Sequence, residues 1–428
     1  MRVVIVHHHL NPGGVTRIIE SQVSGLKNLP VQLLTGSLPE QLPKALTNTD
    51  IISFPDLNYL PRKRYSKQEI QKLLDRILFF LKEHIRENAL LHVHNLNLGK
   101  NPVLTYAVFL LAQKGIPVFN HAHDFAEDRP ANYQFLQEII EGNLGQRLTD
   151  ILYPGLPNLH FGVLNSLDYK RLLNQGVDED RLIWLPNPVA LPSLQNLFSK
   201  SREKEEVCRS LGLAVPEKLV TYPVRVIRRK NIGEFILLSL LFQQEARFIV
   251  TQPPQNPEEQ KLYRRWLALC QNESLNVIFE AGEKVDFHQL LFASDFCITT
   301  SYREGFGMVF LEPWLANTPV TGRNIEYITS DFRNDGLEFP RLYNQILIPG
   351  YSGDFKDLNM EDQMHIIRDI KNRKLNKEAI LQKNPDVKTM FREVPASVME
   401  KNKAIITNKY ALEKYGTKLQ NRYQKMVE

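Results

Sequence analysis

Residues suited to chemistry are densest in the segment 302–313, whose sequence is YREGFGMVFLEP. It follows an apolar run that predicts a strand over residues 296–300. Gly305 and Gly307 allow the backbone to approach a ligand closely. Residues 308–317 are expected to form a helix, and the free N–H groups at the start of a helix favour a phosphate. The segment therefore predicts a loop that holds an anionic ligand.

Two glutamates in this segment, Glu304 and Glu312, add hydrogen-bond acceptors. Glu304 precedes the turn and Glu312 lies about one turn inside the expected helix, so the carboxylates cannot be neighbours on one helix face. We expect them to flank a ligand that lies over the loop. Ionised carboxylates accept strong hydrogen bonds, which suits the hydroxyl groups of sugars and riboses. A glycine turn capped by a glutamate is the alternative interpretation.

A second charged group follows the strand expected at residues 218–223. Arg225 and Lys230 stand five residues apart, and their side chains are expected to converge on one anion. A diphosphate is the favoured ligand, because guanidinium and ammonium groups bind phosphoryl oxygens. Nucleic acid would use the same charges, and a solvated loop would also explain them, so both alternatives stay open.

Histidines mark the end of another expected strand, at residues 118–121. His123 and Asp124 follow this strand directly, and further histidines stand at positions 7, 8, 9, 92 and 94. Zinc sites need three or four converging ligands, and the chain has no HExxH motif, so no metal site is predicted. Histidine at the carboxyl edge of a parallel sheet is instead expected to line a ligand crevice.

A glycine pair, Gly13 and Gly14, separates the first expected strand from a helical stretch. A glycine pair at this place suits close approach to a phosphate or a sugar. A simple tight turn is the alternative. The spacing is not that of the GxGxxG dinucleotide fingerprint, and the chain contains no Walker A sequence.

Short apolar runs alternate with helical periodicity in the first half of the chain. Strands are expected at residues 2–6, 31–35, 90–94, 118–121 and 162–164. Residues 67–86 predict a helix, because their apolar residues recur at spacings of three and four. This alternation favours an α/β fold, with a mostly parallel sheet covered by helices on both faces.

The same alternation restarts after a polar segment at residues 199–206. Further strands are expected at residues 218–223, 246–251, 276–279, 296–300 and 318–321. Two α/β halves of similar size are the most economical interpretation. We expect an N-terminal domain over residues 1–195, a C-terminal domain over residues 196–400, and a last segment over residues 401–428.

The composition of the 428-residue chain, with 43% hydrophobic residues and a net charge of +5, excludes intrinsic disorder and a collagen-like structure. The apolar runs are much shorter than the ~20 residues of a membrane span, and the first residues lack the pattern of a signal peptide. Three widely spaced cysteines fit neither a disulfide framework nor a zinc site, so a cytoplasmic location is expected. The small excess of charge does not argue for a nucleic-acid partner.

In chain order, these motifs resemble those of the GT-B fold glycosyltransferases, in particular the large retaining group-1 family that contains sucrose, trehalose and phosphatidylinositol mannoside synthases. The likeness covers most of the chain, and its specific parts are the Arg-x4-Lys and Glu-x7-Glu motifs. It implies two Rossmann-like domains facing a cleft, with a C-terminal helix at residues 410–426 that crosses back to the N-terminal domain. The second domain would hold a nucleotide-diphosphate sugar, and the first most of the acceptor.

The resemblance also implies a role for each site residue. Arg225 and Lys230 would bind the donor diphosphate and stabilise it as a leaving group. Glu304 would contact hydroxyl groups of the transferred sugar, and Glu312 those of the ribose. The other implied contacts are His123 and Asp124 beside the sugar, Gly13 and Gly14 near the phosphates, and backbone N–H groups around Gly305, Phe306, Gly307, Met308 and Val309.

Glycosyl transfer from a nucleotide diphosphate creates negative charge on the leaving group and positive charge at the anomeric carbon. Two fixed cations and a helix N-terminus would stabilise the leaving group where its charge develops. This can replace a divalent cation, so we expect an enzyme without a metal or another cofactor. The resemblance implies front-face attack with retention, in place of the covalent intermediate of retaining hydrolases.

Two other functions stay open: a disaccharide phosphorylase or trehalose-synthase-like enzyme of the same fold, and a non-catalytic module that binds nucleotide sugars. The acceptor also stays open, as a small molecule, a glycan or a lipid, because residues 316–324 lack glycines that usually stand there. The basic cluster Arg62, Lys63 and Arg64 could contact a membrane surface, a phosphorylated small acceptor, or only solvent.

Overall fold

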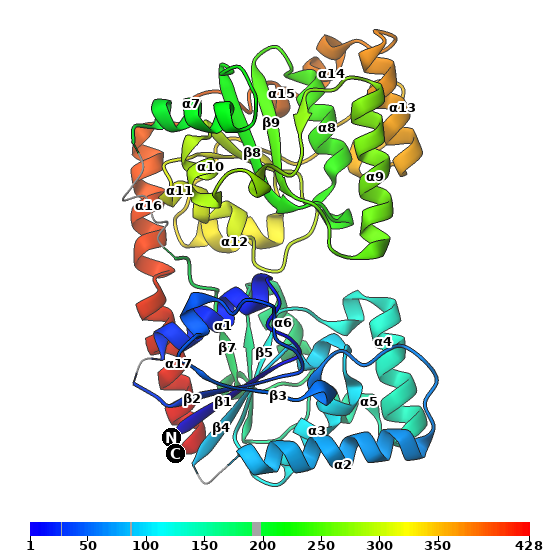
Figure 1. Ribbon diagram of the computed structural model, residues 1–428, viewed down its shortest axis with the longest axis vertical. Helices are drawn as coiled ribbons and strands as arrows, with labels where there is room; N and C mark the ends of the chain where they lie inside the picture. The colour runs from blue at the N-terminus through cyan, green and yellow to red at the C-terminus, as the bar shows by residue number, and fades with distance from the viewer. Residues whose placement is uncertain (27, 86–87, 191–197) are drawn as a thin grey trace. The chain divides into compact units, whose positions relative to one another are not determined.

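The computed structural model describes residues 1–26, 28–85, 88–190 and 198–428, which divide into two compact units. Unit 1 consists of Met1–Pro188 and Tyr410–Glu428, and unit 2 of Val189–Lys409 (Figure 1). The expected domain boundary at residues 195–196 lies outside the described residues. The boundary expected between residues 400 and 401 falls inside helix α16 (Ala396–Lys409), which belongs to unit 2 as a whole.

A seven-stranded parallel sheet forms the centre of unit 1, in the order β3-β2-β1-β4-β5-β6-β7. Its central strands are almost entirely buried, as expected for a parallel sheet covered on both faces, whereas the edge strand β3 is exposed or half-buried. Their bounds are β1 Arg2–His7, β2 Val31–Thr35, β3 Asp50–Ser53, β4 Ala89–His94, β5 Val118–Ala122, β6 Leu159–Val163 and β7 Leu182–Trp184.

The helices Gly14–Gly25, Lys67–His84 and Leu412–Val427 of unit 1 are amphipathic and bury one face, whereas Pro102–Gln113 is buried on nearly all sides. The expected helix at residues 67–86 forms as α2 (Lys67–His84), with a capping box between Ser66 and Glu69; residue 86 lies outside the described residues. The remaining helices are α1 Gly14–Gly25, α3 Pro102–Gln113, α4 Pro130–Gln137, α5 Leu148–Leu152, α6 Ser166–Asn174 and α17 Leu412–Val427.

The C-terminal helix α17 packs on α1 within unit 1, as expected for residues 410–426. The contact depends on two facing glycines, because a Cβ added at Gly416 would lie 2.6 Å from the carbonyl oxygen of Gly25. Figure 1 shows the red α17 against the blue α1. The two ends of the chain therefore belong to one unit.

A six-stranded parallel sheet forms the centre of unit 2, in the order β10-β9-β8-β11-β12-β13. The expected strands form with small shifts at their ends. Their bounds are β8 Lys218–Arg225, β9 Ala246–Gln252, β10 Val277–Ile278, β11 Phe296–Thr299, β12 Val320–Arg323 and β13 Leu342–Tyr343.

The helix expected at residues 308–317 is wrong as one continuous element. The chain forms a 3-10 turn, η9 (Met308–Phe310), and a separate four-residue helix, α11 (Glu312–Leu315). Pro313 has no N–H and its ring clashes with the carbonyl four residues earlier, so a helix cannot run through it. The other helices are α7 Lys200–Ser210, α8 Ile232–Leu241, α9 Pro257–Asn272, α10 Phe287–Ala293, α12 Glu326–Asn334, α13 Met360–Lys371, α14 Lys377–Lys383, α15 Pro385–Lys388 and α16.

Each sheet has a point at which its strand order reverses. In unit 1 this point lies between β1 and β4, and in unit 2 between β8 and β11. Loops at the carboxyl ends of two such strands diverge to opposite faces of the sheet and leave a crevice, where open α/β sheets bind ligands. Among the described residues, every helix falls short of the length and apolar content that a membrane crossing requires.

Candidate active site

The loops that follow β8 and β11 meet at the reversal point of unit 2. The first loop contains the turn η7 (Arg228–Lys230), and the second contains Glu304. Lys230 donates through Nζ to Oε1 of Glu304, and Nη1 of Arg229 lies 2.6 Å from Oε2 of the same carboxylate. Two residues that the sequence predicted as separate parts of a site, Lys230 and Glu304, therefore form one ion pair.

Glu304 is ionised in spite of its burial. Its residue is 9% exposed. Burial by itself raises the pKa of this carboxyl group, but the charges of Lys230 and then Arg229 outweigh it and hold the pKa of Glu304 at about 2. The site therefore contains a fixed carboxylate between two cations at neutral pH.

Tyrosine hydroxyl groups hold the backbone on both sides of the ion pair. Tyr222 Oη donates to the carbonyl of Lys230 at 3.0 Å and lies 2.6 Å from Oγ of Ser301. Tyr327 Oη accepts from the N–H of Glu304 at 2.9 Å and donates to its carbonyl at 2.7 Å. Hydrogen bonds from two tyrosine hydroxyl groups thus hold the backbone of Lys230 and of Glu304 in place.

Arg225 is the last residue of β8, at the same carboxyl edge. Its Nε is buried without a hydrogen-bond partner among the described residues. Buried polar groups in native proteins almost always have a partner, and an arginine fork matches phosphate oxygens. The geometry suits an anionic ligand at Arg225, while its convergence with Lys230 on one anion stays a prediction.

The loop from Gly305 to Val309 presents backbone more than side chains. Gly307 has φ of +88°, and an added Cβ would lie 2.7 Å from Cγ2 of Ile328, so the turn requires glycine. Phe306 and Val309 are buried, and the ring of Phe306 packs edge-to-face on Phe332 at 5.5 Å. These side chains belong to the core, and only their backbone groups are available for a ligand.

Glu312 begins α11 and is half-buried. Burial, and then the negative charge of Glu312, raise the pKa of the Cys297 thiol on β11. The carboxylate of Glu304, in comparison, binds Arg229 and Lys230 of the loop after β8. Met308 lies half-buried between the two, at the start of η9.

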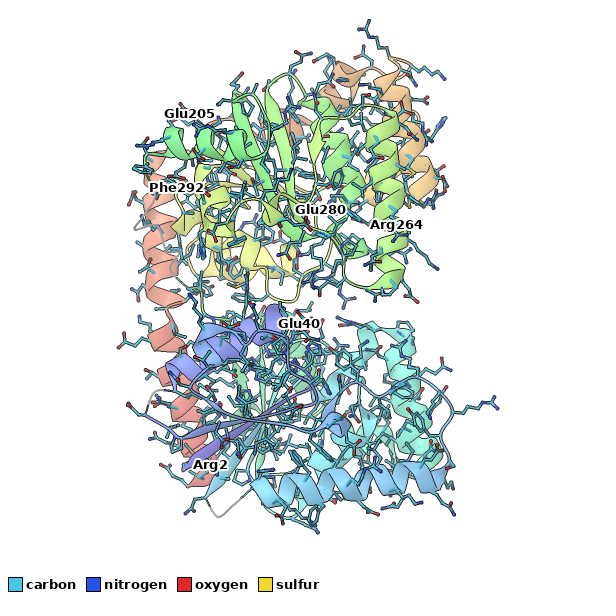
Figure 2. The ribbon with its side chains drawn as sticks, viewed as in Figure 1. Arg2, Glu40, Glu205, Arg264, Glu280 and Phe292 are labelled. Carbon is cyan, nitrogen blue, oxygen red and sulfur yellow. The ribbon has the colours of Figure 1, made fainter. Side chains whose placement is uncertain are left out.

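A cavity of about 620 Å³ lies beside the reversal point of unit 2. Its lining includes Arg228, Asn231 and Tyr302 from the two loops, and Tyr263 and Trp266 from α9. Tyr263 Oη donates to the Glu280 carboxylate at 2.9 Å. Figure 2 labels Glu280, and also Arg264, which lies on α9. The volume falls in the range of small-molecule sites.

The unit 1 residues predicted from the sequence lie at the carboxyl edge of its sheet. His123 and Asp124 follow β5, and Oδ1 of Asn95 accepts from both of their backbone N–H groups, at 2.8 Å and 3.1 Å. Gly13 is extended, with φ of 179°, and a Cβ added at Gly14 would meet nothing within 4 Å. Neither glycine is required by the backbone, and the space around Gly14 is open.

Histidines of β4 and of the end of β5 gather at this edge of unit 1, and His94, His121 and His123 share one hydrogen-bond network with Gln22. His94 Nδ1 lies 2.9 Å from Nε2 of His123, and its Nε2 lies 2.9 Å from Oε1 of Gln22. The Gln22 amide nitrogen lies 3.1 Å from Nδ1 of His121, and Tyr423 of α17 bonds to Nδ1 of His92. Sequence reasoning missed Gln22 and Tyr423, because only the fold brings α1 and α17 to these strands.

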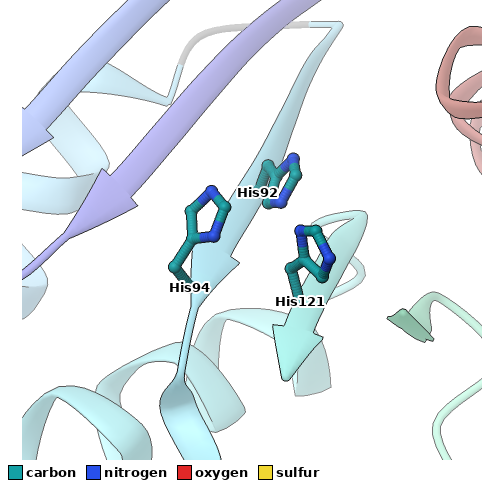
Figure 3. Close-up of side chains that lie close together, drawn as sticks. All are labelled: His92, His94 and His121. Atoms are coloured by element: carbon teal, nitrogen blue, oxygen red, sulfur yellow. The ribbon is translucent and has the colours of Figure 1, made fainter. Parts of the chain in front are cut away.

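Three of these histidines have the arrangement of a metal-binding group. One ring nitrogen from each of His92, His94 and His121 lies within 4.8 Å of the others (Figure 3). Nε2 of His92 and Nε2 of His121 have no hydrogen-bond partner among the described residues. These three rings are the side chains that could hold a transition metal, so the prediction of no metal site has its direct test here.

Residues 203–354 match the family described as "Glycosyl transferases group 1". The matched range lies within unit 2 and contains both specific motifs, Arg225 with Lys230 and Glu304 with Glu312. The chain is also 30% identical, over 344 residues, to a protein of Petrotoga mobilis named mannosylglucosyl-3-phosphoglycerate synthase. The alignment covers 77% of this chain and 66% of that protein, so the chain spans just under two thirds of that relative's length.

Solved structures share the fold at low sequence identity. The Anabaena protein Alr3699/HepE, in complex with UDP and glucose, superposes with a TM-score of 0.63 at 14% identity, over 99% of each chain. The lipopolysaccharide glycosyltransferase WaaG gives a TM-score of 0.55 at 16% identity, over 95% of this chain and 100% of that one. Together with the sequence matches, these likenesses identify residues 203–354 as a group 1 glycosyltransferase domain within a chain that has the fold of solved GT-B glycosyltransferases.

Proposed function

We propose that the protein transfers a hexosyl group from a nucleotide-diphosphate sugar to an acceptor, with retention of the anomeric configuration and without a divalent cation. The observation that carries the proposal is the charge balance at the reversal point of unit 2. Three cationic side chains, Arg225, Arg229 and Lys230, lie at this point, and Glu304 provides one negative charge. The excess positive charge suits a sugar-linked diphosphate.

The cations would act on the leaving group. Negative charge grows on the diphosphate as the bond to the anomeric carbon breaks, and cations already fixed by protein contacts stabilise that charge without reorganising. Lys230 and Arg229 are fixed by Glu304, and Lys230 also by its backbone bond to Tyr222. Each oxygen of the Glu304 carboxylate accepts a hydrogen bond from one cation. A carboxylate oxygen can accept more than one hydrogen bond, so Glu304 could also accept one from a sugar hydroxyl.

The first transfer partner in this scheme is a nucleotide sugar bound by unit 2. Glu312 would accept from the ribose hydroxyls, and the backbone of residues 305–309 would border the sugar and the phosphates. From unit 1, His123 and Asp124 would lie beside the transferred sugar, and Gly13 and Gly14 near the phosphates, as the family resemblance implies. The neighbouring Anabaena structures hold UDP, UDP-glucose, or UDP with glucose, which makes a uridine donor the first to test.

The relative's name supplies an acceptor class. The product named for the Petrotoga protein joins two hexoses to an anionic phosphoglycerate. By analogy, we propose that the acceptor of the present protein is a small, negatively charged glycoside. No step of the scheme uses the histidine triad of unit 1, and the leaving phosphate itself would take the acceptor's hydroxyl proton during front-face attack.

Nucleotide release from a panel of UDP-, GDP- and ADP-linked hexoses tests the activity, with and without glucosyl-3-phosphoglycerate. We expect release of one nucleoside diphosphate that depends on the acceptor, and a product whose new anomeric bond has the donor's configuration by NMR. A phosphate-dependent cleavage of a disaccharide without nucleotide would replace the proposal with the phosphorylase alternative. Nucleotide binding without turnover on any acceptor would favour the non-catalytic module.

A further inference from the structure

A group of basic side chains in unit 1 has no role in the donor scheme. Arg62, Lys100 and Arg129 come from the loops that follow β3, β4 and β5, so the fold brings them to one edge of the sheet. That edge contains the reversal point between β1 and β4. The sequence grouped Arg62 with its neighbours in a basic run, but it gave no sign that Lys100 and Arg129 join it.

The three loops interlock through hydrogen bonds. The N–H of Leu60 donates to the carbonyl of Lys100 at 2.8 Å, which fixes the loop after β3 to the loop after β4. Arg62 donates to Oδ1 of Asn132, and the Asn132 amide donates to the carbonyl of Leu98 at 2.7 Å. The backbone N–H of Asn132 donates to the carbonyl of Arg129 at 2.7 Å. Asn132 therefore connects Arg62 to both other loops, to the loop after β4 through its side chain and to Arg129 through its backbone N–H.

One close backbone approach completes this arrangement. Gly99, directly before Lys100, has φ of +72°, and an added Cβ would lie 2.8 Å from the carbonyl oxygen of Asn132. Glycine is required there on both grounds. Lys100 is consequently held where its Nζ lies 5.1 Å from the centre of the Tyr59 ring.

The charges of this cluster are not balanced by its own carboxylates. Asp124 pairs with Arg129 at 2.7 Å. The nearby Asp128 pairs with Arg171 at 3.0 Å. Among the residues that the structure describes, neither Arg62 nor Lys100 has a carboxylate within ion-pair distance. Burial is the main cause that lowers the pKa of Lys100; the charges of Arg62 and Arg129 lower it further and Asp124 raises it, so these cations lie close enough to act on one another.

We propose that Arg62, Lys100 and Arg129 form a subsite that binds the phosphate or carboxylate of a small, negatively charged glycoside acceptor. The subsite rests on the proposed function, and it assigns to named residues of unit 1 the recognition of the acceptor's charge. Tyr59, 39% exposed beside Lys100, offers a ring face against which the sugar of such a glycoside can pack. An anionic lipid headgroup presents the same phosphate chemistry, and the experiment separates the two sources.

The test uses isothermal titration of the full-length protein with three probes of decreasing charge: glucosyl-3-phosphoglycerate, glucosylglycerate and neutral glucosylglycerol. We expect affinity to fall in that order, and to fall with added salt because the charges are partly exposed. Lys100→Gln and Arg129→Gln are each expected to weaken glucosyl-3-phosphoglycerate by about tenfold, the effect of one lost charged contact. Arg64→Gln removes the same charge from a neighbouring exposed position and is expected to leave affinity unchanged.

Two controls keep the outcome interpretable. Thermal melts of each variant confirm folding, and UDP affinity, which depends on unit 2, is expected to stay at the wild-type value. Equal affinity for the charged and neutral probes would overturn the subsite, and so would equal losses in Lys100→Gln and Arg64→Gln. Sedimentation with phosphatidylglycerol vesicles that depends on Lys100, without binding of the small probes, would also overturn it. Failure of the proposed function would appear separately, as absence of nucleotide release.

Discussion

The guanidinium Nη1 of Arg229 lies 2.6 Å from Oε2 of Glu304, and the other oxygen of that carboxylate binds Lys230. Glu304 thus connects the loop after β8 to the loop after β11 at the place where the strand order of unit 2 reverses. The sequence motif pointed to Arg225 and Lys230 as the cations, and the structure adds Arg229 to the same carboxylate.

Replacing Glu304 tests whether this carboxylate positions the cations. Glu304→Gln is expected to lower kcat by about 100-fold or more, the scale of losing one preorganised electrostatic group, because Lys230 and Arg229 lose their common anchor. Nucleotide affinity is expected to change by less than tenfold, since the cations remain. Steady-state kinetics and UDP titration measure the two effects, and an unchanged kcat would contradict the assigned role.

The same pair makes a prediction about stability. Lys230→Met leaves a buried carboxylate with Arg229 as its remaining partner, and we expect a loss of roughly 2–3 kcal/mol in unfolding free energy. In the double variant Lys230→Met, Glu304→Gln, the buried charge is gone, so part of that stability is expected to return. Activity is not expected to return. Urea unfolding of the two single variants and the double variant gives the comparison; additive losses would mean that the pair is not coupled.

Arg225 is expected to serve the ligand and not the fold. Arg225→Gln is predicted to weaken UDP binding by about tenfold or more while leaving unfolding free energy nearly unchanged, since its buried Nε has no protein partner to lose. Arg247 supplies the matched control, because its Nε is also buried without a partner but it lies at the amino end of β9. A similar affinity loss in Arg247→Gln would show that the effect is general and not local to the site.

Gly307 and Gly14 are glycines for different reasons: the backbone conformation requires Gly307, whereas Gly14 is predicted to approach a substrate. Gly307→Ala forces a side chain into a left-handed backbone and against Ile328, so we expect a stability loss of about 1–3 kcal/mol. Gly14→Ala meets no protein atom within 4 Å and begins a helix, so stability is expected to stay equal or to rise slightly. If Gly14 approaches a substrate, transfer activity will fall in Gly14→Ala in spite of its intact fold; unchanged activity removes Gly14 from the site.

The buried histidines predict sensitivity to acid. Burial lowers the pKa of His7, His92, His94, His121 and His123 well below 6.5, and lowers that of His8 to about 4. Because the unfolded chain binds these protons first, their stabilisation is complete above pH 6.5 and is lost as pH falls below it. For His8 the loss continues to about pH 4 and amounts to roughly 3 kcal/mol.

Chemical unfolding at pH 7.5, 6.5, 5.5 and 4.5 measures this dependence. Burial raises the pKa of Asp168 to about 6, so protonation of this carboxyl group stabilises the folded protein as pH falls. Asp168 is a single group, and we expect the several buried histidines to have the larger effect on stability. His8→Gln removes one of these groups and is expected to make the slope shallower than that of the wild-type protein. A stability that is constant from pH 7.5 to 4.5 would contradict the buried, neutral state of the cluster.

Chelation tests the prediction of metal independence. Dialysis against EDTA is expected to leave the rate of transfer unchanged, since the cations of unit 2 carry the role of a divalent ion in the scheme. A loss of activity that Mg²⁺ or Mn²⁺ restores would contradict it. Metal analysis of the purified protein, compared with His92→Gln, shows separately whether the triad of His92, His94 and His121 holds an ion.

The alternation of apolar runs was enough to predict an α/β fold with parallel sheets, because buried parallel strands are short, apolar and separated by helices. The strands β3, β7 and β13 were missed. They are two to four residues long, and β3 has exposed or half-buried residues throughout, so no apolar run marks it. The C-terminal helix was found from the family resemblance, but its contact through Gly25 and Gly416 has no signal in one sequence.

The site was predictable where its residues follow one strand and hidden where distant segments meet. Arg225 is the last residue of β8, and Lys230 and Glu304 follow the ends of β8 and β11 within a few residues, which the sequence reveals. Sequence reasoning did not single out Arg229 from its basic neighbours, and Tyr327 lies 23 residues beyond Glu304, whose backbone it binds. The helix expected at residues 308–317 was wrong as one element because the interpretation left out Pro313, which can stand in the first turn of a helix but not in its interior.

Nucleoside diphosphate release, measured with a panel of nucleotide sugars and with glucosyl-3-phosphoglycerate as acceptor, tests the central claim most directly. The account predicts acceptor-dependent release from one donor, with rates reduced by about 100-fold in Glu304→Gln and retained in Arg247→Gln. Release at the wild-type rate in Glu304→Gln and in Arg225→Gln, or no release from any donor by the wild-type protein, would contradict it.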